Sequence, residues 1–259
     1  MRARPRVPAL FVGHGSPMNA LEHNRFTRAW HDFARSAPRP RAILAISAHW
    51  YVPMTAVTAM ARPRTIHDFS GFPEALSAFE YPAPGDPALA QQVCALLEPV
   101  EVVAAVDTWG LDHGSWSVLA HLFPDADVPV VALSIDRRAS AGEHVARGAA
   151  LAPLRDEGVL VMASGNVVHN LGALDRGAPD GATDWNTAFD DAARTLMTTR
   201  PVAVTELEHH PAYRLAAPSP DHLVPLYYVA GLASAAGSTA EVLVAGPTLG
   251  SLSMTSYVV

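Results

Sequence analysis

Three short apolar runs in this chain each lead into a segment that carries a histidine, and this repeated arrangement restricts the fold more than any other feature. The runs cover residues 7–12, 42–47 and 158–163, and the histidines that follow them are His14, His49 and His169. Each run has the length and the apolar content of a strand that is buried on both faces. The sequence therefore predicts several buried strands that end near histidines.

Segments with helical apolar spacing separate these runs. Residues 19–37 lie between the first two runs, and Pro38 follows as a stop signal. A strand, a helix and a second strand in this order form a right-handed crossover, which makes the two strands parallel. Helices are also predicted over residues 88–97, 141–155, 183–199 and 220–233, and further strands over 54–60, 100–106, 128–135, 241–244 and 252–258.

The order of elements predicts an α/β fold in which helices flank a mostly parallel or mixed sheet. The chain has 259 residues, of which 49% are hydrophobic, so it can bury one large core. No linker or repeat divides it, and we expect one catalytic domain over residues 1–259. Residues 62–87 form a long irregular segment rich in proline and glycine, and loops of that length are usually functional.

The histidines at the strand ends predict a metal site. Ligands of open α/β sheets bind outside the carboxyl ends of the strands, so His14, His49 and His169 are expected to converge there. His113 and His222 approach from loops or helix starts. Imidazole clusters suit zinc, iron, copper or nickel, whereas magnesium and calcium prefer oxygen ligands.

The other histidines have different expected roles. His67 lies among aromatic residues in the long irregular segment, and we expect it to line the pocket without binding metal. Solvent exposure is expected for four histidines on predicted helix faces, namely His23, His31, His121 and His144. His209 and His210 precede Pro211 in a predicted surface turn.

Composition excludes several function classes. All 18 basic residues are arginines, which excludes Schiff-base chemistry and a P-loop lysine. The single cysteine, Cys94, excludes an intrachain disulfide and a thiolate cluster. The net charge of −7 disfavours a nucleic-acid partner, and no apolar run is long enough to span a membrane. A cytoplasmic location is therefore expected.

Two familiar motifs are incomplete. Residues 13–16 resemble a phosphate-binding turn, but Met18 stands where a dinucleotide motif needs glycine. Neither Ser16 nor Ser115 has the downstream glycine of a serine-hydrolase elbow. Ser16 is therefore expected to cap a helix or to bind substrate oxygens.

An ordered set of motifs along essentially the entire chain resembles one family. These motifs lie at residues 8–18, 47–50, 65–69, 81–85, 109–116, 163–170 and 250–254. Together they are similar to those of the DODA-type (DOPA 4,5-dioxygenase) branch of the class III extradiol ring-cleaving dioxygenases. The motifs are highly specific for the family and much less specific for the substrate.

The resemblance implies a role for each matching histidine. His14, His49 and His222 would hold one divalent metal ion, with His222 in place of the glutamate that the wider superfamily uses on Fe(II). His169 would act as the active-site base and could serve as a fourth ligand before substrate binds. His113 would be the second acid/base residue. Ser16, Asn166 and His67 would contact the substrate.

The function that the resemblance implies is insertion of O2 into a catechol-type substrate, DOPA-like or another aromatic diol, with ring opening to a muconic semialdehyde. Fe(II) is expected for turnover because zinc is redox-silent, although Zn(II) suits an all-histidine site equally well. Two alternatives are a zinc-dependent hydrolase that uses the same cluster and a catalytically silent metal-binding relative. The sequence leaves the oligomeric state open.

Overall fold

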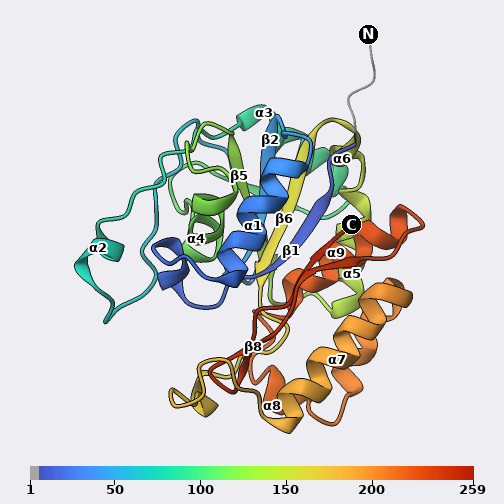
Figure 1. The fold of residues 1–259 in the computed structure, drawn as a ribbon. Helices are drawn as coiled ribbons and strands as arrows, with labels where there is room; N and C mark the ends of the chain where they lie inside the picture. Colours follow the sequence, from blue (N-terminus) through green and yellow to red (C-terminus); the bar gives the residue numbers. More distant parts are fainter. Residues whose placement is uncertain (1–5) are drawn as a thin grey trace.

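One mixed sheet forms the centre of the protein in a computed structural model that describes residues 6–259 (Figure 1). Four neighbouring strands in the middle are parallel, and an antiparallel pair flanks them on each side; at one edge the last two strands are again parallel to each other. In spatial order the strands are β4 (Val102–Ala105), β3 (Thr55–Thr58), β5 (Val130–Asp136), β2 (Ala42–Val52), β6 (Val159–Gly165), β1 (Ala9–Gly13), β10 (Ser256–Val258) and β7 (Glu241–Val244). The predicted α/β fold is confirmed.

Helices cover both faces of the sheet because alternate strand residues point to opposite sides. Leu10 and Val12 of β1 belong to the core under α1 (Arg25–Ser36) and α4 (His113–Leu122). Ala9 and Phe11 belong to the opposite core, which contains side chains of α3 (Pro87–Leu96), α5 (Ala141–Ala150), α6 (Pro153–Asp156), α7 (Asp184–Thr199) and α9 (Val224–Ala235).

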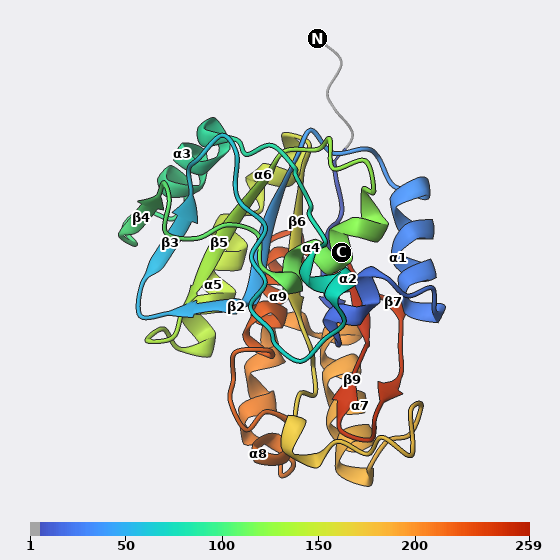
Figure 2. The same cartoon turned by 90° about the vertical axis from the view of Figure 1, so that its left-hand side faces the viewer.

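The remaining elements are short. They are the helices η1 (Pro17–Ala20), α2 (Glu74–Ser77), η2 (Leu171–Ala173), η3 (Pro201–His209) and α8 (Tyr213–Ala216), and the hairpin of β8 (Pro247–Thr248) with β9 (Leu252–Ser253). Figure 2 shows α7, α8 and β9 beyond the carboxyl ends of the central strands. Within residues 6–259, none of the helices combines the length and apolar content needed to cross a bilayer.

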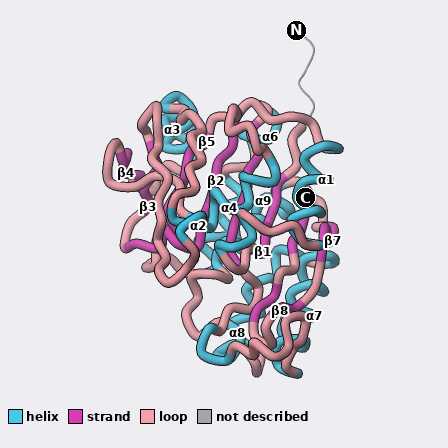
Figure 3. The backbone as a smooth tube through the Cα atoms, turned by 60° about the vertical axis from the view of Figure 1, so that its left-hand side comes forward, coloured by secondary structure: helices cyan, strands magenta, loops and turns pink. Residues whose placement is uncertain are grey.

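The long irregular segment predicted over residues 62–87 is largely a loop, interrupted by α2 (Figure 3). It packs against α4, where Trp116 Nε1 donates a hydrogen bond to the carbonyl of Ile66 and the Trp116 ring stacks on that of Phe79. The loop therefore covers the helix whose first residue is His113.

Several element boundaries differ from those predicted. The helix expected over 19–37 is divided into η1 and α1, because the Asn24 side chain caps α1 by accepting from the amides of Phe26 and Thr27. The helix expected over 141–155 breaks before Pro153 into α5 and α6. The strand expected over 42–47 continues to Val52, so His49 lies inside β2.

Two of the four helix-face histidines are buried, so the prediction of exposure was wrong for them. His121 Nε2 lies 2.6 Å from the carbonyl oxygen of Asn19, and His144 Nδ1 lies 3.1 Å from the hydroxyl of Tyr228. These hydrogen bonds offset the cost of removing the polar ring nitrogens from water. His23 and His31 are exposed as predicted.

Two glycines allow α5 and α9 to pack closely. A Cβ atom at Gly231 would lie 2.0 Å from the carbonyl oxygen of Val145, and one at Gly148 would lie 2.1 Å from that of Tyr228. We expect Gly231→Ala to lower the free energy of unfolding by about 1–3 kcal/mol, because backbone must shift to admit the methyl group. Urea unfolding measures this change.

Gly142→Ala in α5 is the matched control, since a Cβ atom there meets nothing within 4 Å. It should leave the free energy of unfolding unchanged or raise it by up to about 1 kcal/mol. Equal effects of the two substitutions would contradict close packing at Gly231.

Candidate metal centre

His14 is the innermost of the clustered histidines. It follows β1 directly, its side chain is buried, and its amide donates to the carbonyl of Gly165 at the end of β6. Its Nδ1 lies 2.9 Å from Ser164 Oγ. The Ser164 hydroxyl donates its own proton to the carbonyl of Gly114, so Oγ accepts from His14. Because Nδ1 is engaged with Ser164, Nε2 is left to face the neighbouring imidazoles.

His49 lies where the pairing of β2 with β5 shifts register between Ile46 and Tyr51. A bulge of this kind re-aims side chains out of the regular alternation. His49 Nδ1 lies 2.8 Å from Asp68 Oδ2, and its Nε2 lies 3.2 Å from the Nε2 atom of His14. Two nitrogens at that separation can bind one ion at the usual metal–nitrogen distance of about 2.0–2.1 Å.

His113 completes a tight group of three. It is the first residue of α4, and its Nδ1 lies 2.8 Å from the other oxygen of Asp68, Oδ1. The ligand nitrogens of His14, His49 and His113 all lie within 4.8 Å of one another. A metal site that includes His113 is therefore geometrically possible, in addition to the predicted set with His222.

His222 lies close to both His14 and His49, and His169 lies next to His222. The ring centre of His222 is 5.3 Å from that of His14 and 5.1 Å from that of His49, and its Nδ1 lies 2.7 Å from Asp221 Oδ2. His169 stacks on His222 with ring centres 3.5 Å apart and an interplanar angle of 5°. The structure thus gathers all five predicted histidines.

Burial and mutual repulsion keep most of these rings neutral. Burial, reinforced by the neighbouring imidazoles, lowers the pKa of His14 well below its ordinary value, and burial likewise lowers the pKa of His222. Burial and the adjacent His222 lower the pKa of His169 to about 3. Neutral imidazole is the form that binds a metal ion or accepts a proton.

Asp68 opposes the effect of burial on the pKa of two rings, those of His49 and His113. Burial lowers the pKa of His49, but the hydrogen bond to Asp68 and nearby carboxylates raise it above its ordinary value overall. Burial lowers the pKa of His113 in spite of the same carboxylate. Hydrogen bonds from both rings outweigh burial at Asp68 itself and lower its pKa, so this carboxylate is ionised.

Sequence reasoning missed the groups that orient the imidazoles. Asp68, Asp221 and Ser164 each accept a hydrogen bond from a ring Nδ1, which fixes the tautomer and leaves Nε2 free. Asp68 lies inside the motif at residues 65–69, and Asp221 directly precedes His222. Because metal-binding histidines usually donate their second ring nitrogen to an acceptor, carboxylates close to the histidines in the sequence could have been identified as candidates.

The three predicted substrate-contacting residues occupy different surroundings. Ser16 caps η1 by accepting from the amide of Met18. Asn166 is fully buried, with its amide group bonded to the carbonyl of Ser253 and to the amide of Gly15. His67 Nε2 lies 2.8 Å from the carbonyl of Phe79. Among them, only Ser16 and His67 retain partial exposure.

Phe69 is the aromatic side chain from the loop that stands nearest to the cluster. Its ring meets that of His113 edge-on at 5.6 Å, and Phe72 packs edge-on against it at 5.3 Å. Both side chains are partly exposed, whereas Trp116 is fully buried and Trp50 stacks on Trp109. Phe69 and Phe72 therefore can form a wall beside the histidines.

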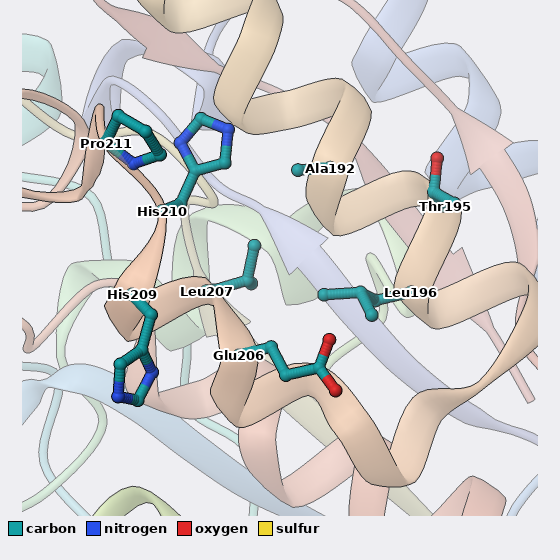
Figure 4. Close-up of a pocket in the computed structure, with 8 residues that line it drawn as sticks. All are labelled: Ala192, Thr195, Leu196, Glu206, Leu207, His209, His210 and Pro211. Carbon is teal, nitrogen blue, oxygen red and sulfur yellow. The ribbon is translucent and has the colours of Figure 1, made fainter.

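A separate hollow of about 590 Å³ lies between α7 and η3 (Figure 4). Its lining includes the apolar side chains of Leu196 and Leu207 and the polar side chains of Glu206, His209 and His210. None of the five clustered histidines lines it, so the chemistry lies elsewhere. His210 Nδ1 accepts a hydrogen bond from the amide of Ala212, which gives this ring a structural role beside Pro211.

The five-histidine cluster has the donor set of a transition-metal site. Each of the rings at positions 14, 49, 113 and 222 has Nδ1 engaged with a protein oxygen, and within residues 6–259 no oxygen acceptor engages its Nε2. Nitrogen ligands of this kind suit zinc or iron, and the oriented second nitrogens match what such sites require. The residues present fit a single divalent ion.

Comparison with known proteins adds independent information. Residues 6–259 match the family model described as the catalytic LigB subunit of aromatic ring-opening dioxygenase. The chain is 48% identical to a 4,5-DOPA dioxygenase extradiol of Escherichia coli (strain K12), across 97% of this chain and 94% of that one. It is 38% identical to a protein of the same name from Beta vulgaris, across 90% and 89% of the two chains.

A solved structure has the same fold. The crystal structure of an uncharacterized protein from Escherichia coli K12 superimposes with a TM-score of 0.87 at 42% sequence identity. The match covers 98% of this chain and 100% of that one.

Removal of an imidazole should weaken metal binding according to its place in the cluster. Calorimetric titration of the metal-free protein should give one divalent ion per chain, and His14→Ala or His49→Ala should reduce affinity at least about 10-fold. Comparison of His222→Ala with His113→Ala identifies the third ligand, which we expect to be His222. His209→Ala, in the separate hollow, is the control, and an equal loss there would contradict the site.

Proposed function

The chain belongs to the LigB family of aromatic ring-opening dioxygenases, and from this premise we propose that it inserts O2 into a catechol-type substrate, DOPA-like or another aromatic diol, to give a muconic semialdehyde. The resemblance to the DODA-type class III extradiol enzymes is confirmed by these relatives. Enzymes of this family depend on a metal ion. The observation that carries the proposal is the cluster of His14, His49 and His222 around one point.

We propose that His14, His49 and His222 hold the metal. When bound, a redox-active ion such as Fe(II) would bring catechol and dioxygen together and relay electrons between them, which redox-silent zinc could not do. Ser164, Asp68 and Asp221 hold the three rings in the tautomer that presents Nε2. The protein thus supplies an oriented set of neutral nitrogen ligands.

Two further histidines carry the proton transfers. Burial and the adjacent His222 keep His169 neutral at physiological pH, so one ring nitrogen is unprotonated and can accept a proton from a catechol hydroxyl. His113 lies next to His49, with Nδ1 bonded to Asp68 and Nε2 available to the reacting oxygen atoms. We assign His169 as the base and His113 as the second acid/base residue, which would take up a proton at Nε2 and return it to the reacting oxygen atoms during ring opening.

The substrate ring would lie beside the loop. Phe69 stands edge-on to His113 at 5.6 Å, and an aromatic ring next to it would gain the usual edge-to-face contact. His67, fixed by the carbonyl of Phe79, and Ser16, at the start of η1, are the polar groups that we propose as further substrate contacts. Asn166 would support Ser16 indirectly, through the amide of Gly15.

Membership of the family favours oxygen chemistry over the zinc-dependent hydrolase. A silent metal-binding relative would keep the cluster and lack turnover. The identity of the metal, the cytoplasmic location and the absence of a nucleic-acid partner stay predictions.

Oxygen consumption tests the proposed reaction. An oxygen electrode should record uptake when the Fe(II)-loaded protein meets a panel of catechols that includes DOPA, and no uptake with Zn(II) in place of Fe(II). Activity that persists without oxygen would favour the hydrolase. Metal uptake without turnover of any catechol would favour the silent relative.

Substitution of the proton carriers should separate catalysis from metal binding. We expect His113→Ala and His169→Ala to lower kcat by about 10²–10⁴-fold, the usual contribution of a positioned acid or base. Metal content, measured by elemental analysis, should stay near that of the unchanged protein. Loss of the metal in either variant would contradict the assigned roles.

A further inference from the structure

Asp68 contacts two rings of the cluster with one carboxylate. Oδ2 accepts from His49 Nδ1 at 2.8 Å, and Oδ1 accepts from His113 Nδ1 at 2.8 Å and from the His113 amide at 3.1 Å. The two rings so joined are 3.9 Å apart, centre to centre. Both oxygens are therefore used, and each orients a different imidazole.

The other two acceptors, Ser164 and Asp221, each orient a single ring. His14 is oriented by Ser164, which is part of the buried strand β6, and His222 is oriented by Asp221, its neighbour in the chain. Asp68 instead comes from the irregular segment between β3 and α3. It is the acceptor that joins this loop to the site.

The loop is pinned to the start of α4 near Asp68. The amide of Ile66 donates to the carbonyl of Leu111 at 2.7 Å, and the Leu111 amide donates to the carbonyl of Arg64 at 2.9 Å. On the other side, His67 is bonded to the carbonyl of Phe79. These contacts place Asp68 against the histidines without using its carboxylate.

The carboxylate has no other ionic role among residues 6–259. Its only ion-pair partners in this part of the chain are His49 and His113, and its side chain is 18% exposed. A carboxylate that only anchored the loop would not need to bond to both imidazoles.

We propose that Asp68 is a positioning residue that holds a metal ligand, His49, and the acid/base residue His113 in one fixed relation. The loop that carries Asp68 thereby becomes part of the metal centre. Loss of the carboxylate would free both rings at once, although the metal ligands themselves would all remain. The half of this proposal that concerns His113 rests on the proposed function.

Cobalt binding tests the first half without any turnover. Asp68→Ala should weaken Co(II) binding to the metal-free protein by about 10–100-fold, measured by calorimetry, and should alter the visible absorption spectrum of bound Co(II). In the His113→Ala background, addition of Asp68→Ala should still weaken binding, because His49 loses its acceptor. An unchanged affinity and spectrum in either comparison would overturn the proposal.

Asp68→Asn separates positioning from loop shape. The amide has the same size but replaces one acceptor oxygen by a donor NH2 group, so it cannot accept from both rings. We expect its Co(II) affinity to stay at least about 10-fold below that of the unchanged protein. Affinity restored to that of the unchanged protein would mean that Asp68 only shapes the loop.

Ser70→Ala is the matched control, since Ser70 is an exposed residue of the same loop two positions away. It should leave affinity, spectrum and turnover unchanged, and a loss equal to that of Asp68→Ala would overturn the assignment to the carboxylate. With saturating Fe(II), Asp68→Ala should lower kcat about 10–100-fold and change KM little. An unchanged kcat would overturn the role through His113.

The two proposals can fail separately. If the unchanged protein opens no catechol ring, the proposed function fails, and the Co(II) comparison still decides whether Asp68 orients His49. If ring opening occurs and Asp68→Ala binds Co(II) normally, the proposed function stands and the positioning role fails.

Discussion

The arrangement of this protein depends on one interaction, which is the engagement of Nδ1 by a protein oxygen in four of the five clustered imidazoles, His14, His49, His113 and His222. Ser164, Asp68 and Asp221 supply those oxygens, and each comes from a different part of the chain. Without them the rings could rotate or change tautomer, and their Nε2 atoms would no longer converge. The sheet, the loop and the turn before α9 therefore have to meet at one place.

The same interaction determines the charge of the site. Ring centres of neighbouring imidazoles lie 3.5–5.7 Å apart, so the rings cannot all be protonated together. Burial favours the neutral form at His14, His169 and His222. The hydrogen-bonded carboxylates stay ionised, so the cluster combines neutral nitrogen ligands with nearby negative charge, which favours a bound cation.

Much of this could be predicted from the sequence, because strand ends are local signals. Apolar runs that lead into His14 and His169 indicated which edge of the sheet carries the site, and His49 lay near the end of its strand. The acceptors could not be predicted this way, since Asp68 reaches the site through a loop whose path depends on tertiary contacts. Burial of His121 and His144 also depends on partners far away in the chain.

The central claim is that imidazoles, and not carboxylates or thiolates, surround one metal ion. X-ray absorption spectroscopy of the Fe(II)-loaded protein tests it most directly, because the spectrum reports the atoms bound to the ion. The account predicts nitrogen neighbours at about 2.0–2.1 Å with the outer-shell scattering of at least three imidazole rings. A shell of oxygen atoms without imidazole scattering would contradict it.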